Sequence, residues 1–228
     1  ERGSSAWTVL VRPELGGGLS AKSRYLRGKT LKREARALGL DPDTQTVVCL
    51  RIKVENRRTD MGVLRRIRVI QRGTGSGGPV RFLVPPEIGA LKKGQSASVV
   101  LGLLFSASSD RDGSLVAKFE VKSDRGSHQV EVRPPLGELL LPCKLGKKAF
   151  EGEMNKLQGM YQRTTTSFSL PSVGKASVEE LRATLPGRIV KHGNLTPVGK
   201  FGWRDDDKCA FAGKLPVSGS TVCVVVTC

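Results

Sequence analysis

Apolar and polar residues alternate along much of the first 135 residues, which is typical of half-buried β-strands. Between residues 48 and 55, apolar side chains occupy the even positions and charged side chains occupy positions 51, 53 and 55. Further strands are predicted at 64–71, 80–84, 97–105, 115–122 and 128–133. Turn-forming residues separate these short strands, so the pattern favours an antiparallel β-sandwich, of the immunoglobulin-like type. Residues 31–38 fit either an earlier strand or a short basic helix, and the pattern does not choose between them.

The pattern changes after Pro134 and Pro135. Residues 136–142 are apolar between prolines, which predicts an extended segment that crosses between two subdomains. Beyond it, Phe150, Met154 and Leu157 have helical spacing.

A second helix is predicted from a capping box, in which Ser177 is followed by Glu180, and Pro186 is expected to end it. Strand-like runs at 159–170, 208–215 and 220–228 complete a small α+β subdomain. The expected fold is therefore mainly β, with an N-terminal sandwich and a C-terminal α+β platform. The predicted boundaries are a basic flank at 1–45, which leaves room for a first strand, the sandwich at 46–135, the crossover at 136–142 and the platform at 143–228.

The net charge limits the classes of binding partner to be considered. The formal charge of +17 favours polyanionic partners, namely nucleic acid, an anionic membrane or acidic peptides. Five cysteines at irregular spacings, without a C-x-x-C motif, indicate reduced thiols and a cytosolic protein rather than disulfides or a metal site. No apolar run approaches the about 20 residues that a membrane span needs. Because the chain opens with Glu1 and lacks a leader pattern, we expect a segment of a longer protein.

Several stretches resemble the C-terminal appendage, or ear, of the beta subunit of adaptor-protein complex three, a beta-adaptin. The closest are VEVRPPLGELLLP at 130–142, residues 150–160, and FAGKLPVSGSTVCVVV at 211–226. A weaker likeness covers GGGLSA at 16–21 and the strand at 47–54. Since none of these stretches is a catalytic motif, the resemblance depends on their order along the chain.

This resemblance implies a sandwich and platform at the end of a flexible hinge. It further implies a non-enzymatic domain that binds short peptide motifs of accessory and regulatory proteins, in coats that carry cargo from Golgi and endosomes to lysosome-related organelles. The other adaptor subunits would be partners through the parent chain, and the location would be cytoplasmic, peripheral on Golgi and endosomal vesicles. No catalytic residue, cofactor or metal is expected. The alternatives are a basic nucleic-acid-binding domain, which no fingerprint supports, and a module that contacts an anionic membrane.

Four possible chemical motifs have simpler explanations. The glycines at 73, 75 and 78 satisfy G-x-G-x-x-G, but a strand follows instead of a helix, so a hairpin loop is expected. Gly28-Lys29-Thr30 lacks the earlier glycine of a phosphate loop. His128 shares a strand face with Val130, which favours a packed imidazole, and His192 is expected in a loop. The aspartates at 205–207 are expected in a solvated turn.

Two groups of residues are candidate binding sites. The first is a basic cluster, in which Arg66 and Arg68 share a strand face and can present paired guanidinium groups to phosphate or carboxylate. The members of this cluster are Arg57, Arg58, Arg65, Arg66 and Arg68. A simple solvated face that keeps the protein soluble is the alternative.

The second group lies in the predicted platform and would hold an acidic-aromatic peptide. Tyr161 and Arg163 alternate on a predicted strand, so a ring would lie beside a cation. Phe201 and Trp203 are further anchors, and Trp203 is the ring most expected to be exposed. Phe168 is assigned to the core.

Overall fold

The computed structural model describes residues 6–72, 80–105, 116–157, 159, 162–167, 178–199, 208–215 and 219–227. The chain divides into two compact units, Glu1–Leu139 and Leu140–Cys228. The division falls within the stretch that was predicted to be a crossover. Each unit has its own hydrophobic core and is described by itself below.

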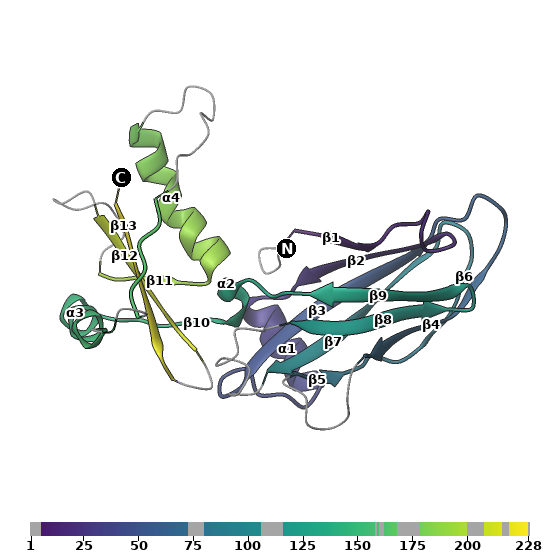
Figure 1. Cartoon of the computed structure of the whole chain (residues 1–228), viewed down its shortest axis with the longest axis horizontal. Helices are drawn as coiled ribbons and strands as arrows, with labels where there is room; N and C mark the ends of the chain where they lie inside the picture. The colour runs from purple at the N-terminus through teal and green to yellow at the C-terminus, as the bar shows by residue number, and fades with distance from the viewer. Residues whose placement is uncertain are drawn as a thin grey trace. The chain divides into compact units, whose positions relative to one another are not determined.

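Unit 1 contains a five-stranded antiparallel sheet in the order β1-β2-β3-β7-β5 (Figure 1). Its strands are β1 (Thr8–Val11), β2 (Leu19–Tyr25), β3 (Thr46–Asn56), β7 (Ser96–Phe105) and β5 (Val80–Leu83). The long central pair, β3 and β7, is in continuous register from Thr46↔Phe105 to Glu55↔Ser96. The alternation in β3 is as predicted, since Leu50, Ile52 and Val54 are fully buried.

The second sheet of unit 1 has four antiparallel strands in the order β6-β4-β8-β9. They are β6 (Ile88–Leu91), β4 (Leu64–Gln71), β8 (Ala117–Ser123) and β9 (Gly126–Val132). Its inner face contributes Leu64, Ile67, Phe119 and Val121 to the same core as the first sheet. Two sheets that bury alternate residues against each other form a sandwich, so the predicted fold class is confirmed.

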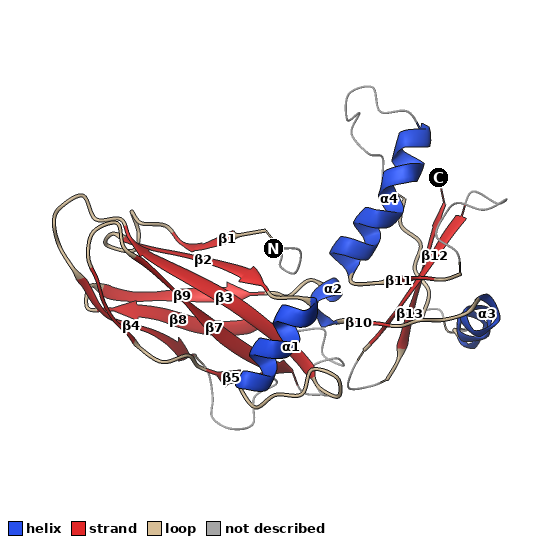
Figure 2. Cartoon of the chain, turned by 180° about the vertical axis from the view of Figure 1, so that it is seen from behind, coloured by secondary structure: helices blue, strands red, loops and turns tan. Residues whose placement is uncertain are grey.

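The open question at residues 31–38 is settled in favour of a helix, α1 (Gly28–Ala37), which lies across the outer face of the five-stranded sheet (Figure 2). Its apolar side, which includes Leu31 and Ala35, packs on Val47 and Cys49. Burial raises the pKa of the Cys49 thiol to about 12, with a smaller contribution from Glu34. Apolar residues at 31, 35 and 38 lie on one side of a helix, so a helix can bury all three against the sheet. In a strand, these positions would not all point to the same side.

Residues 136–142 are not extended throughout, as was predicted. The first part forms a helical turn, α2 (Leu136–Leu139), and only β10 (Leu141–Pro142) is a strand. The turn is closed by the Glu138 N–H, which donates to the Pro135 carbonyl at 2.8 Å. It is held by the Glu138 carboxylate, which is buried against the Arg27 guanidinium with Nε to oxygen distances of 2.8 and 3.0 Å. A buried ion pair at this position outweighs the extended bias of the flanking prolines.

Unit 2 is built on β12 (Lys208–Lys214), which pairs along its whole length with β13 (Thr221–Thr227). On its other side β12 pairs with β11 (Thr196–Pro197) and β10. The helices are α3 (Lys147–Lys156) and α4 (Val178–Gly193). Leu140, Leu195, Cys209 and Phe211 form the core, against which α4 packs Ile189 and Val190. The predicted mixed α+β composition is thus confirmed for this unit.

Two predictions in unit 2 are wrong. The second helix does not end at Pro186 but continues to Gly193, and Pro186 is buried inside it. A proline within a helix costs about 3 kcal/mol, and the packing of the partly buried Ile189 and Val190 beyond it acts against that loss. In the predicted strand at 159–170, the described residues 162–167 form no strand. Phe150 is buried, in keeping with its place on the apolar side of α3.

Four cysteines lie in the described ranges, and all four are free thiols. Cys49 and Cys209 are buried, as expected for thiols in strands, whereas Cys143 and Cys223 are only partly buried. Burial, with smaller effects of Glu153 and Cys143, raises the pKa of Cys223. Among the described residues, no helix is long and apolar enough to cross a membrane.

Candidate functional site

Most of the predicted aromatic anchors lie outside the described residues. This applies to Tyr161, Phe201 and Trp203, and also to Phe168 and the aspartates at 205–207. Arg163 is exposed and is not in a strand, and its guanidinium donates a hydrogen bond to the Met154 carbonyl near the end of α3. The strand that was to align Arg163 with Tyr161 is therefore absent at Arg163.

The five arginines of the basic cluster separate into two groups. Arg57 and Arg58 follow β3, and both are paired with nearby acids. The Arg58 side chain is only 15% exposed, and its Nε donates to Asp60 at 2.6 Å. That hydrogen bond lowers the pKa of Asp60 to about 2. Arg58 thus fixes the loop after β3 and is poorly placed to meet a ligand.

Arg65 has a structural role through its main chain. Its N–H donates to the Asp124 carboxylate at 3.0 Å, and its carbonyl accepts the Asp124 N–H at 3.0 Å. This pair of hydrogen bonds fastens the β8–β9 turn to β4. The Arg65 side chain is exposed at the end of the sheet.

Arg66 and Arg68 lie on one face of β4, as predicted, although the strand is not regular. Arg66 has a positive φ of 53°, and the pairing with β8 shifts by one residue between Arg65 and Arg68. An extra residue in one strand is a β-bulge, which re-aims the side chains that follow. The bulge leaves both Arg65 and Arg66 exposed before Ile67 returns to the core.

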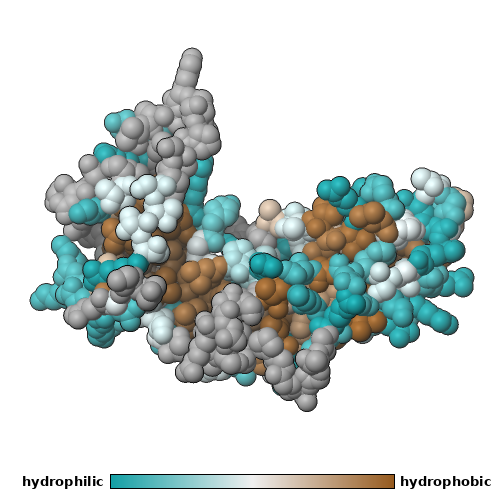
Figure 3. Space-filling model, viewed as in Figure 1, coloured by the Kyte–Doolittle hydropathy of each residue, from teal (hydrophilic) through white to brown (hydrophobic). Residues whose placement is uncertain are grey.

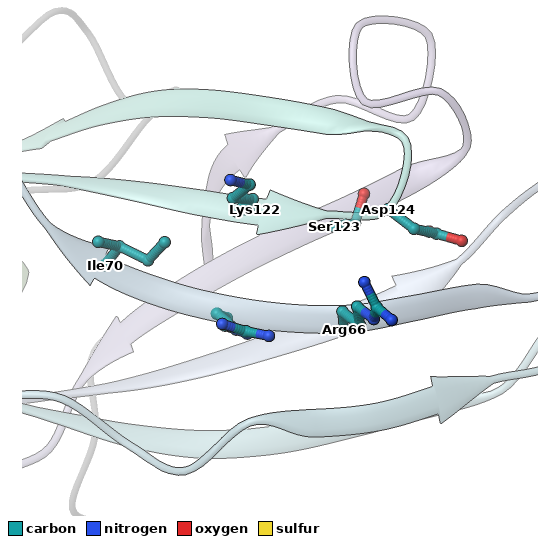
Figure 4. A pocket seen from close by; sticks show the side chains of 6 residues that line it. Arg66, Ile70, Lys122, Ser123 and Asp124 are labelled. Carbon is teal, nitrogen blue, oxygen red and sulfur yellow. The ribbon is translucent and has the colours of Figure 1, made fainter.

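These two arginines line an open depression of about 360 Å³ on the outer side of the four-stranded sheet (Figure 4). Its lining residues are Arg66, Arg68, Ile70, Lys122, Ser123 and Asp124. Lys122 was missed from the sequence, because it joins the site only through its cross-strand register with Arg68. Spacing along one strand carries no signal for a partner on another strand.

The electrostatics of this β4–β8 depression favour an anionic ligand. Arg68 is paired with Glu87 at 2.5 Å. Within the described parts of the chain, neither Arg66 nor Lys122 has an ion-pair partner. Ile70 is 38% exposed and lies at the end of the depression away from Arg66, with Lys122 between them (Figure 4), so the depression offers apolar surface as well as two available cations. The arrangement can bind a carboxylate or phosphate group that is followed by an apolar side chain.

The polar groups at the floor of the depression are already engaged in the fold. The Ser123 hydroxyl oxygen accepts the Arg125 N–H at 3.2 Å. The Asp124 carboxylate accepts the Arg65 N–H. Neither is aligned with a base and a nucleophile, which an acid-base mechanism would require.

The remaining candidate motifs are placed as follows. His128 shares its face of β9 with the buried Val130, as predicted. His192 lies in the last turn of α4 rather than in a loop. Gly28-Lys29-Thr30 begins α1, and the glycines at 73, 75 and 78 lie outside the described residues.

No family model matches the chain. Among curated proteins, it is 30% identical over 141 residues to AP-3 complex subunit beta-2 of Mus musculus, which covers 60% of this chain and 11% of that protein. It is 31% identical over 139 residues to AP-3 complex subunit beta-1 of Bos taurus, with 61% and 12% covered. The human AP-3 complex subunit beta-1 is 29% identical over 139 residues, with 61% and 11% covered. The chain thus spans about a tenth of the length of these relatives. The similarities confirm the predicted resemblance of this chain to the beta subunits of the AP-3 complex.

Proposed function

We propose that the chain is the docking appendage of a beta-type adaptor subunit and acts in vesicle transport. Its task is to bind short peptide motifs of accessory and regulatory proteins while the coat forms on Golgi and endosomal membranes and cargo moves toward lysosome-related organelles. The similarity to AP-3 beta subunits supports the coat assignment. The remaining adaptor subunits are partners of the parent protein.

The observation that carries the docking proposal is the β4–β8 depression. Arg66 and Lys122 offer two cations to carboxylates, and Ile70 offers apolar surface to one neighbouring side chain. An acidic segment with one large apolar residue fits this set. The ligand would lie on a sheet surface that needs no rearrangement to receive it.

Modest affinity is sufficient for such a domain. A depression of about 360 Å³ accepts only a few side chains, so each contact is weak. Many appendages on one coat raise the effective concentration for a partner that carries several motifs. Assembly and release can then both be rapid.

The lining residues support docking rather than catalysis, because Ser123 and Asp124 are committed to main-chain hydrogen bonds. They also favour peptide over single-stranded nucleic acid. The six lining residues include no aromatic ring, and base stacking on rings is the main sequence-independent attraction for single strands. We therefore propose no enzymatic activity and no nucleic-acid function.

The test is binding of a fluorescein-labelled peptide with four aspartates around one phenylalanine, measured by fluorescence polarisation. The double variant Arg66→Asn/Lys122→Gln removes both cations, and asparagine tolerates the positive φ at position 66. We expect the dissociation constant to be at least tenfold larger for this variant, because hydrogen bonds to charged groups contribute about 1.5–3 kcal/mol each.

The matched control is Lys92→Gln/Lys93→Gln, in the turn between β6 and β7, which lowers the net charge by the same amount. It should bind as the parent does. A peptide with alanine for phenylalanine should bind more weakly to the parent chain. Equal losses in both double variants would show attraction to net charge alone and would overturn the site.

A further inference from the structure

A second basic surface lies on the opposite side of unit 1, on the outer face of the five-stranded sheet. Four cations, which we call the cation ladder, occupy neighbouring positions on β2 and β3. In the strand register Lys22 is directly opposite Lys53, and Arg24 is directly opposite Arg51. Like charges directly opposite each other destabilise a sheet. The ladder therefore repeats an unfavourable pairing in two successive outward-facing pairs.

Nearby groups neutralise the ladder only in part. Arg51 is paired with Glu34 of α1 at 3.3 Å. The Arg24 guanidinium lies 4.6 Å from the centre of the Trp7 ring, a cation–π contact. For Lys22 and Lys53, the described residues provide no ion-pair partner. Both lysines are half-buried, as is typical of lysines whose stems lie along a surface while their ammonium groups reach solvent.

Exposed apolar side chains on β1 and just before it border the ladder. Val9 is directly opposite Lys22 in the register and is 51% exposed. Trp7 is 40% exposed although its ring touches Arg24. The ladder side of unit 1 faces away from the viewer in Figure 3, which shows hydrophobic surface near the upper edge of unit 1. An exposed tryptophan beside cations is the composition of a membrane-interface surface.

Helix α1 extends the basic surface along the same side of the sheet (Figure 2). Its exposed residues include Lys29, Lys32, Arg33 and Arg36. The acids around it are engaged, because Asp43 accepts from Lys32 and Arg36 while Glu34 accepts from Arg33 and Arg51. The acids are thus shared among more cations than they can neutralise.

We propose that this side of the sandwich is a membrane-contacting surface that binds anionic lipid. The cation ladder lies against lipid phosphates, and Trp7 and Val9 enter the headgroup region. The exposed Trp7 and Val9 favour a lipid surface over a duplex or a purely acidic peptide, because neither of these would give Val9 an apolar partner. The contact is separate from the β4–β8 depression, so the domain can dock a peptide while it rests on a membrane.

Flotation of the whole chain with phosphatidylcholine vesicles, with and without phosphatidylserine, tests this proposal. A basic residue near an anionic leaflet contributes about 1 kcal/mol, so Lys22→Gln/Lys53→Gln should lower the partition coefficient by about 30-fold. Lys92→Gln/Lys93→Gln removes the same charge and should lower it far less. Arg66→Asn/Lys122→Gln should also retain vesicle binding, and this result separates the membrane contact from peptide docking.

Tryptophan fluorescence locates the contact. The chain has two tryptophans, so Trp203→Phe leaves Trp7 as the single reporter. Brominated lipid in anionic vesicles should quench Trp7. Absence of quenching would overturn the proposal, as would equal losses in the two lysine double variants. A loss of duplex DNA binding in Lys22→Gln/Lys53→Gln as large as the loss of vesicle binding would also overturn it, because it would show a general polyanion surface.

Discussion

Two strand pairs on the outer faces of the sandwich, β8–β9 and β2–β3, contain similar residue types but pair their charges in opposite ways. On the four-stranded sheet, Lys118 is directly opposite Glu131, with 3.8 Å between their charged groups. On the five-stranded sheet, Lys22 is directly opposite Lys53. The β8–β9 pair neutralises itself at this position, whereas the β2–β3 pair concentrates positive charge, as Arg68 opposite Lys122 also does in the β4–β8 depression. The net charge of +17 is therefore not a uniform property of the surface.

The difference arises from strand register rather than from composition. Lysines on β2, β3 and β8 each fall on the polar side of an alternating strand. Only the residue directly opposite on the neighbouring strand decides whether a lysine meets an acid or another lysine. A strand pair with complementary charges is suited to remain in solvent, whereas a pair with like charges gains from an external anion.

The largest expected effect concerns the buried ion pair between Arg27 and Glu138. This pair joins the start of α1 to α2, and the Glu138 side chain is only 3% exposed. Glu138→Gln leaves the Arg27 charge partly buried without its partner, so we expect a loss of about 3–5 kcal/mol in the free energy of unfolding of unit 1. Urea denaturation followed by circular dichroism measures it.

The control for this prediction is Glu55→Gln, which removes the carboxylate partner of Arg57, whose side chain is 50% exposed. Because exposed pairs contribute only about 0–1 kcal/mol, this variant should unfold close to the parent. Similar stabilities for the two variants would mean that the α2 turn does not depend on its ion pair.

Strong alternation made the long strands predictable, and short elements without it were missed. The prediction for β4 has the observed bounds, because Leu64, Ile67 and Val69 mark its inner face. In contrast, β6 has only four residues, one of which is Gly89, and carries too little periodic signal. The helix past Pro186 could not be predicted, because its stability comes from packing in unit 2 rather than from local propensity.

The candidate sites show the same limit. The shared face of Arg66 and Arg68 followed from spacing within β4. Lys122 did not, because it comes near them through the pairing of β4 with β8. The pairing of Lys22 with Lys53 likewise cannot be predicted from the sequence pattern, because the two residues are 31 positions apart and meet only in the folded sheet.

Single charge reversals on β3 and β9 should exchange the behaviour of the two strand pairs. Lys53→Glu replaces the like-charge pair of Lys22 and Lys53 by a lysine opposite an acid. We expect a gain of about 0.2–1 kcal/mol in the free energy of unfolding. Glu131→Lys creates a like-charge pair with Lys118 and removes the partner of Arg133, so a loss of similar size is expected.

Added salt should shrink both changes, because the charges are near solvent. Thermal melts at low and high salt provide the measurement. If Lys53→Glu destabilised the chain at low salt, the ladder would be neutralised within the protein, and the membrane proposal would lose its electrostatic basis.

The smallest expected effect is a difference between the β8–β9 and β2–β3 pairs in how the stability of the fold depends on acid pH. A hydrogen bond from Arg133, helped by the charges of Arg133 and Lys118, lowers the pKa of Glu131 below its usual 4.5. A carboxylate with a lower pKa in the folded state stabilises the fold above its unfolded pKa, and this contribution is lost as the pH falls through the folded pKa. Glu131→Gln should therefore flatten the fall in urea midpoint between about pH 5 and about pH 3. Lys22→Gln/Lys53→Gln should leave that slope unchanged, because lysines stay protonated throughout this range. A slope altered by the lysine variant and not by Glu131→Gln would contradict the assignment of Glu131 as the neutralising partner of Lys118 and Arg133.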